Sequence, residues 1–176
     1  EGNAFNNCDG LTSLIIPSTV TSIGYSAFGG CNLTSLETHY KECSYELVSL
    51  TNSLQTLVIG AEVNTIDCSY GFFDQCNALT SITVESGNPK YDSRGNCNAL
   101  IETSTNTLIK GCKNTVIPST VTTIGEKAFW QCSGLTSINI PNSVTTINNM
   151  AFRDCSNVTS ITIGNGVSSI YPASFA

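Results

Sequence analysis

The sequence contains few charged residues, and most of those are acidic. Only 11% of its 176 residues are Asp, Glu, Lys or Arg, whereas about a quarter is typical of soluble domains. Seven basic residues against 13 acidic ones give a formal net charge of −6. They form no basic stripe for a phosphate backbone or an anionic membrane surface. We therefore expect no nucleic-acid partner.

Long apolar runs are also missing. No stretch approaches the ~20 consecutive apolar residues that a membrane-spanning helix needs, so we expect no membrane insertion within this segment. The residues from Glu1 onward do not have the pattern of a signal peptide. The chain opens with EGNAF, just before one repeated unit, and closes with SFA, just inside another. We expect a fragment of a longer array, with any signal or anchor outside it.

Residues that usually carry catalysis or bind metals are scarce. His39 is the single histidine and stands among polar neighbours, so we expect a surface residue and not a catalyst or ligand. No Cys-x-x-Cys pair occurs, which leaves a zinc site without support. We predict no enzymatic activity, no metal and no cofactor.

What the sequence has instead is an internal repeat. The stretch from Ala128 to Met150, AFWQCSGLTSINIPNSVTTINNM, recurs directly from Ala151 as AFRDCSNVTSITIGNGVSSIYPA, and an earlier copy begins at Ala4. A fixed period of roughly 20–29 residues is the signature of a solenoid. We predict one array over residues 1–176, with about seven coils including irregular ones.

Each coil has the same expected order of elements. Leu14 and Ile16 alternate with polar residues, as a strand with one buried face requires. Pro17 should end that strand because it cannot donate to a sheet, and VTSIG follows as a second short strand. The Ala-Phe-x-x-Cys segment fits one helical or 3-10 turn with a buried face.

The cysteines follow the repeat. Five occupy one position, three residues after the Phe: Cys8, Cys31, Cys76, Cys132 and Cys155. Stacked coils would place these side chains parallel to one another, which suits buried thiols better than disulfides. Cys97 and Cys112 lie off this ladder and could face each other across a hairpin, so a bridge between them stays open.

Two segments depart from the period. In residues 38–53, Tyr40, Cys43, Leu47 and Leu50 have the spacing of a short amphipathic helix. In residues 85–115, the runs CNALIE and TLIKGC flank TSTN and predict a β-hairpin.

The recurring frame AFxxCxxLTSIxIPxxVTxIG resembles the leucine-rich repeats of the BspA-like type. The resemblance implies a right-handed, β-rich leucine-rich-repeat solenoid of the α/β class, with short parallel strands and short helical or 3-10 turns. It also implies a bacterial cell-surface or secreted protein, often from Bacteroides, that binds proteins or mediates adhesion. No catalytic residues accompany this family.

Two surfaces are candidates for binding. One is the outward row of the main sheet, since solenoids commonly bind through such a face; the alternative is a plain solvated face of small hydroxyl residues. Its members are Ser35, Glu37, Thr56, Val58, Ser81, Thr83, Ser137, Asn139, Ser160 and Thr162. The other is formed by the insertions, through Tyr40, Tyr45, Tyr91 and Arg94; the alternative is that these are simple surface connections.

We therefore expect a non-enzymatic recognition or adhesion module. It would act as a monomer and bind a protein or a glycan on a host or neighbouring cell. A structural spacer that projects another domain and a carbohydrate-binding accessory module are the alternatives. A spacer would show no binding in isolation, and a carbohydrate module would be favoured by a row of exposed aromatic side chains.

Overall fold

The structure is a computed structural model that describes residues 2–44, 47, 52–67, 73–74 and 76–176. The chain separates into two compact units. Unit 1 comprises Glu1–Leu79 and Val84–Pro89, and unit 2 comprises Thr80–Thr83 and Lys90–Ala176. The division falls within strand β6 (Ser81–Val84). No helix among the described residues is both long and apolar enough to cross a membrane.

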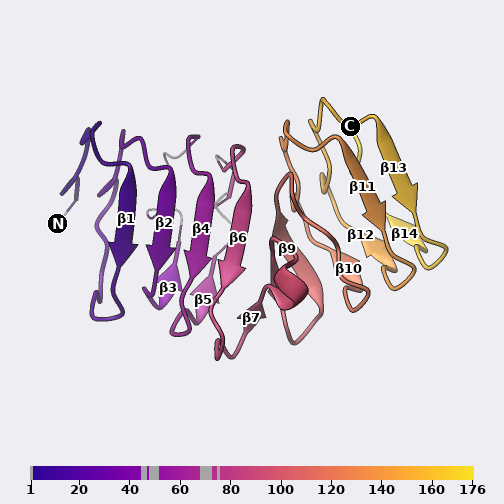
Figure 1. The fold of residues 1–176 in the computed structure, drawn as a ribbon, viewed down its shortest axis with the longest axis horizontal. Coiled ribbons are helices and arrows are strands. Elements are labelled where there is room, and N and C mark those ends of the chain that lie inside the picture. The colour runs from indigo at the N-terminus through magenta and orange to yellow at the C-terminus, as the bar shows by residue number, and fades with distance from the viewer. Residues whose placement is uncertain (1, 45–46, 48–51, 68–72, 75) are drawn as a thin grey trace. The chain divides into compact units, whose positions relative to one another are not determined.

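Unit 1 is built on two ladders of parallel strands (Figure 1). The main ladder contains β1 (Ser13–Ile16), β2 (Ser35–Thr38) and β4 (Thr56–Ile59), with Leu14, Leu36 and Leu57 in register. The shorter ladder pairs β3 (Glu42–Cys43) with β5 (Thr65–Ile66). The strands predicted from the repeat are therefore confirmed in this unit, and identical positions of successive coils lie side by side.

The first irregular segment keeps part of the solenoid pattern. Cys43 lies on β3 and pairs with Ile66 of β5, so it is not on a helix. Leu47 is buried as the amphipathic pattern predicts. Tyr45 and Leu50 lie outside the described residues. The prediction that Cys43 is buried is correct, but a strand and not a helix buries it.

Unit 2 also has two ladders. The main one pairs β11 (Ser137–Ile140) with β13 (Ser160–Ile163) in parallel. The second sheet has the order β14-β12-β10-β9-β8-β7. Its strands are β7 (Tyr91–Asp92), β8 (Ala99–Glu102), β9 (Thr107–Gly111), β10 (Thr123–Ile124), β12 (Thr146–Ile147) and β14 (Ser169–Ile170).

The predicted hairpin in the second irregular segment is confirmed. β8 and β9 are antiparallel, and the register shifts once between Leu100 and Ile101. β9 then pairs in parallel with β10, Leu108 beside Ile124. β9 therefore takes the place of a second short strand. The parallel part of this sheet continues from it through β10, β12 and β14.

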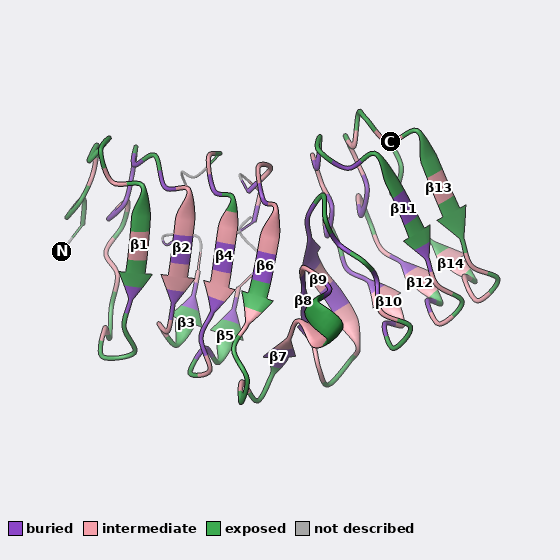
Figure 2. Ribbon diagram, viewed as in Figure 1, coloured by how far each residue is buried: buried purple, intermediate pink, exposed green. Residues whose placement is uncertain are grey.

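Inward-facing aliphatic side chains fill each unit. In unit 1, Leu33, Leu36, Leu54 and Leu57 are fully buried. The core of unit 2 follows the same repeat positions and includes Phe129, Leu135, Val144 and Ile147. Burial alternates along β2, β4 and β11, as Figure 2 shows. This alternation orients the polar residues of the strands outward.

Side-chain donors link each coil to the one before it. The hydroxyl groups of Thr34 and Thr159 donate to the carbonyls of Thr12 and Thr136, at 3.1 and 3.2 Å. The Cys155 thiol donates to the carbonyl of Phe129 at 3.0 Å. Cys31 makes the equivalent bond to the Phe5 carbonyl. The repeated Thr and Cys positions are thus explained by contacts between coils.

The Ala-Phe-x-x-Cys segments are turns, so the expected helical or 3-10 turns and the α/β class are not confirmed. Lys127 and Gln131 have φ values of 54°, in the left-handed region, which interrupts any helix. Because left-handed and right-handed residues alternate in the turn, every second backbone N–H points toward the next coil. Phe129 and Gln131 therefore donate to Ala151 and Arg153 of the next coil, at 2.7 and 2.9 Å. The one 3-10 helix with described bounds is Arg94–Asn96, in the insertion.

The described cysteines are unbridged thiols. Cys97 and Cys112, the pair left open by the sequence, are both free and buried. Their sulfurs instead contact the carbonyls of Ala99 and Asn98. In the repeat ladder, Cys31, Cys76 and Cys132 are buried. The prediction of buried thiols is confirmed for these residues, whereas Cys8 is exposed.

Thiol labelling should separate the exposed and buried cysteines. Burial raises the pKa of Cys43 to about 12, so the reactive thiolate is nearly absent at neutral pH. Cys8 is exposed. In native protein at pH 8 we expect iodoacetamide to modify Cys8 at least ~100-fold faster than Cys43, as measured by peptide mass spectrometry. Equal rates in native protein would contradict the burial, and urea should remove the difference.

Candidate functional site

The outward row of the main ladder forms one candidate binding surface in each unit. In unit 1, Glu37 and Val58 are neighbours in register, and Ser35 lies beside Thr56. All four side chains are half-buried. Ser81 and Thr83, on β6, belong to unit 2; Ser81 is half-buried and Thr83 is exposed.

On β11 and β13 of unit 2, the predicted outward residues are exposed. Ser137 lies beside Ser160, and Asn139 lies beside Thr162. All four are exposed. The structure therefore brings together the predicted residues of this face in pairs, at positions where a partner could reach them.

A shallow hollow of about 590 Å³ lies at the C-terminal end of this exposed row. Asn139 and Thr162 contribute to it from β11 and β13, and Asn142 and Asn165 from the turns that follow. The Asn165 N–H is held by the side-chain oxygen of Asn142 at 2.9 Å. The turn of Asn165 also packs closely on the turn before it: a Cβ added at Gly164 would lie 2.7 Å from backbone atoms of Pro141 and Asn142. The hollow thus offers several uncharged donors and acceptors beside aliphatic side chains.

The insertion residues are less available than the sequence suggests. Tyr91 is only 6% exposed, in β7, so its ring belongs to the core and does not form a surface contact. Arg94 is half-buried and donates to Asp92, Asn106 and Thr120. Tyr40 is half-buried and lies two residues after the end of β2. Tyr45 lies outside the described residues. Arg94 therefore organises its own loop instead of projecting from it.

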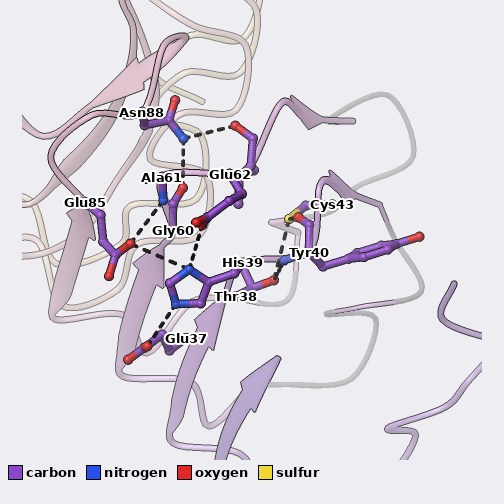
Figure 3. A network of polar contacts seen from close by, with 11 residues as sticks. Glu37, Thr38, His39, Tyr40, Cys43, Gly60, Ala61, Glu62, Glu85 and Asn88 are labelled. Atoms are coloured by element: carbon purple, nitrogen blue, oxygen red, sulfur yellow. Dashed lines mark hydrogen bonds and ion pairs between the residues drawn. The ribbon is translucent and has the colours of Figure 1, made fainter. Parts of the chain in front are cut away.

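A cluster of charged side chains surrounds His39 in unit 1 (Figure 3). The His39 Nε2 atom lies 3.1 Å from Glu37 Oε1. On the other side of the ring, Nδ1 lies 2.9 Å from Glu62 Oε2 and 3.6 Å from Glu85 Oε2. Both ring nitrogens thus face carboxylates, and the ligand-forming atoms of Glu37, His39 and Glu85 all lie within 4.8 Å of one another.

The backbone around His39 is shaped to hold this arrangement. Gly60 lies beside the ring, and a Cβ at this position would overlap His39 Nδ1. The Ala61 N–H donates to Glu85 Oε2 at 3.1 Å. Asn88 donates to the carbonyls of Gly60 and Val63, at 2.9 and 3.0 Å, which ties down the same turn. The ring and the Glu85 carboxylate are therefore fixed by neighbouring coils.

The electrostatics of the cluster follow from these contacts. Hydrogen bonding to Glu62 and Glu37 raises the pKa of His39, because both carboxylates favour the charged ring. The same contact lowers the pKa of Glu62. The His39 side chain is 20% exposed, so this expected surface residue is partly covered by its neighbours.

A periodic signal could have revealed this cluster. The interval from His39 to Glu62 equals that from Glu62 to Glu85, and both equal the period of the repeat. Residues one period apart in a solenoid lie in adjacent coils. Glu62 and Glu85 are supplied by later coils, so the residues next to His39 in the sequence do not indicate them.

The ladders of short parallel strands and the recurring coil-to-coil hydrogen bonds define a leucine-rich-repeat solenoid. The family model described as "BspA type Leucine rich repeat region" matches residues 1–103 and 101–176, in six copies. The chain belongs to this family of BspA-type leucine-rich repeat proteins. A search of curated protein sequences gives no match.

Three solved structures share the fold. The pneumococcal vaccine antigen PcpA gives a TM-score of 0.70 at 21% identity, over 89% of this chain and 40% of its own. A leucine-rich repeat protein from Eubacterium ventriosum gives 0.60 at 23%, over 95% and 57%. A leucine rich cell surface protein from Faecalibacterium prausnitzii gives 0.60 at 26%, over 94% and 45%. The chain thus spans only 40 to 57% of the length of these proteins.

Proposed function

We propose that this chain is a non-enzymatic recognition module that binds an uncharged, hydrogen-bonding partner, either a protein or a glycan. The observation that supports this proposal is the exposed row of unit 2 together with its hollow, where Asn139, Asn142, Thr162 and Asn165 converge. Amide side chains both donate and accept hydrogen bonds, as recognition of sugar hydroxyls or peptide groups requires. The absence of charged residues from this lining favours an uncharged partner.

A location at the bacterial cell surface suits this role. The Faecalibacterium prausnitzii protein with the same fold is described as a cell surface protein. A surface protein would meet host proteins, mucins and glycans of neighbouring cells. We extend this location, and a role in adhesion, to the present chain as part of the proposal.

The described thiols fit a structural role better than a catalytic one. Burial raises the pKa of Cys31 and Cys132, and it raises that of Cys155 to about 11. Catalytic cysteines need a lowered pKa so that the thiolate forms at neutral pH. Cys31 and Cys155 are therefore placed to join coils and not to attack a substrate.

A binding screen with matched variants tests the proposal. The chain is applied to arrays of host matrix proteins, mucins and bacterial surface glycans. Asn139→Arg and Thr162→Arg each place a long charged side chain in the exposed row. We expect either to weaken binding by roughly tenfold or more, a loss of about 1.4 kcal/mol.

The control is Ser169→Arg, which adds the same side chain on β14, in the other sheet of unit 2. Binding that is lost equally in all three variants would contradict the proposed face. Tyr40→Ala tests the insertion of unit 1 separately. A chain that binds nothing on any array would favour the spacer alternative.

A further inference from the structure

We propose that protonated His39 is a pH-sensitive clamp that joins three coils of unit 1 and opens when the ring loses its proton. The clamp consists of His39 with Glu37, Glu62 and Glu85 (Figure 3). It is independent of the binding face of unit 2. Three observations support it: the hydrogen bonds of both ring nitrogens, the origin of the carboxylates in different coils, and the fixed position of the ring.

Both ring nitrogens lie within hydrogen-bonding distance of a carboxylate. Nε2 is 3.1 Å from Glu37 Oε1, and Nδ1 is 2.9 Å from Glu62 Oε2. An ionised carboxylate only accepts hydrogen bonds, so each contact needs an N–H on the ring. Only the protonated imidazole carries an N–H on both nitrogens. The two contacts are therefore those of the charged ring.

Loss of the ring proton would make one of these contacts repulsive. A neutral imidazole keeps a single N–H and has a lone pair on its other nitrogen. With the N–H on Nε2, the Nδ1 lone pair faces Glu62 and also Glu85, whose Oε2 atom lies 3.6 Å away. With the N–H on Nδ1, the Nε2 lone pair faces Glu37. In either tautomer two acceptors oppose each other, so the neutral ring favours separation of the coils at this point.

The charged groups that face the ring come from three coils of unit 1. Glu37 lies on β2, and His39 directly follows that strand. Glu62 lies in the turn after β4, and Glu85, which belongs to unit 1, directly follows β6. The strands are neighbours in the order β2-β4-β6. One proton on one ring therefore controls contacts from the first of these coils to the two that follow it.

The backbone holds the ring and one carboxylate in place. Gly60 leaves the space that the His39 ring occupies, because a Cβ there would overlap Nδ1. The Ala61 N–H donates to Glu85 Oε2, the same oxygen that approaches the ring. Glu85 thus has a donor that does not depend on pH and stays beside the ring in either protonation state. Loss of the ring charge therefore leaves this carboxylate without its compensating cation.

The direction of the pH effect follows from the contacts. Hydrogen bonding to Glu62 and then to Glu37 raises the pKa of His39. A group whose pKa is higher in the folded chain stabilises the fold fully below its unfolded pKa, and this stabilisation is lost as the pH rises through the folded pKa. The unfolded value for histidine is about 6.5. The clamp is therefore closed in mildly acidic solution and opens as the solution becomes alkaline.

Opening of the clamp would also change the outward row of unit 1. Glu37 belongs to this row and lies in register with Val58. While His39 is protonated, the Glu37 charge is paired with the ring. When the ring is neutral, the same carboxylate is available to solvent or to a partner at this surface. The clamp thus links pH to the charge that unit 1 presents.

The single histidine makes the clamp directly measurable by NMR, because every imidazole signal belongs to His39. The ring signals are followed through a pH titration of the native chain and of the same chain unfolded in urea. We expect the native midpoint to lie above the unfolded one, with an N–H on both ring nitrogens on its acidic side. Equal midpoints, or a native midpoint below the unfolded one, would overturn the proposal.

Hydrogen exchange tests the opening itself. The Gly60 N–H donates to the Thr38 carbonyl, and the Ala61 N–H donates to Glu85, so both amides report on contacts between the clamped coils. Their protection, corrected for the intrinsic pH dependence of exchange, should fall between pH 6 and pH 9. In His39→Gln, which has no titrating ring, it should not change over this range. Protection that falls equally in the two chains would show that another group is responsible and would contradict the clamp.

Variants of the carboxylates identify the partners of the ring. We expect Glu62→Gln and Glu37→Gln each to lower the titration midpoint of His39, and Glu62→Gln to lower it more, because Glu62 contributes most to the raised pKa. The matched control is Glu42→Gln, the same change of charge at an exposed residue of β3 outside the cluster, which should leave the midpoint unchanged. An equal decrease in all three variants would show a general charge effect and reject the clamp. Circular dichroism confirms that each variant is folded.

Discussion

Replacing Phe129 with alanine is expected to lower the free energy of unfolding by about 3–5 kcal/mol. The Phe129 side chain is completely buried in the core of unit 2. Its ring stacks on that of Phe152 with centroids 4.9 Å apart, and Phe152 stacks in turn on Phe175 at 5.2 Å. Removal therefore loses apolar burial, leaves a cavity and interrupts the ring stack, each of which is unfavourable.

Trp130 provides the measurement for this prediction. It is the only tryptophan and follows Phe129 directly, so its fluorescence reports on unit 2. We expect the urea midpoint of Phe129→Ala to fall well below that of the unaltered chain. Phe5→Ala is the matched control, because Phe5 occupies the same position of the repeat but is 50% exposed. An unchanged Trp130 midpoint in Phe129→Ala, or an equal shift in the two variants, would contradict the role assigned to the buried stack.

Replacing Gly111 with alanine should be the second most damaging change. Gly111 lies at the end of β9, and its N–H donates to the Ala128 carbonyl at 2.9 Å. An added Cβ would overlap the Phe129 ring at Cε1 and Cζ. Because the ring is fully enclosed, it cannot move aside freely, and overpacking of this kind costs about 1–3 kcal/mol.

A double-mutant cycle identifies this steric cause. In the Phe129→Ala background the overlapping ring is gone, so Gly111→Ala should cost much less there than in the unaltered chain. We expect a coupling of about 0.5–3 kcal/mol between the two sites, measured from urea midpoints. Gly134→Ala is the control, because its Cβ would meet only the flexible Lys113 side chain. Strict additivity of Gly111→Ala and Phe129→Ala would show that Gly111 is required for another reason.

Much of the fold can be predicted from the sequence because the repeat supplies the same information several times. Leu36, Leu57 and Ile138 lie inward on strands, as their alternation predicts. The hairpin over 99–111 also follows from its two β-rich runs and the short turn between them. A buried position that recurs once in every coil leaves little freedom in strand register.

The turns could not be predicted in the same way. A helical turn would bury Ala128, Phe129 and Cys132 on one face, and the observed turn buries the same three residues. Their spacing therefore does not distinguish the two conformations. The decisive feature is the left-handed φ at Lys127 and Gln131, which neither residue type indicates. These conformations are favoured only because the next coil accepts the N–H groups that they redirect. That information lies in the contact between coils and not in the local sequence.

The His39 cluster was missed for a related reason. Glu62 and Glu85 lie one and two repeats from His39, and the coil from Leu36 to Leu57 is shorter than the regular repeat. The shortened coil places Gly60, and not Glu62, beside His39 along the ladder; the Gly60 N–H donates to the Thr38 carbonyl at 2.8 Å. Glu62 reaches the ring from beyond Gly60 in the following turn. The contact therefore depends on both the register and the shape of the turn.

The side-chain bonds between coils give the solenoid a direction. The Thr34 and Thr159 hydroxyls and the Cys155 thiol all donate to the coil that precedes them in sequence. The turn N–H groups of Phe129 and Gln131 donate in the opposite direction, to the coil that follows. Each coil is therefore bonded to both neighbours by different groups on different sides. A coil inverted in the stack would lose both sets of bonds at once, so the order and the polarity of the coils are fixed together.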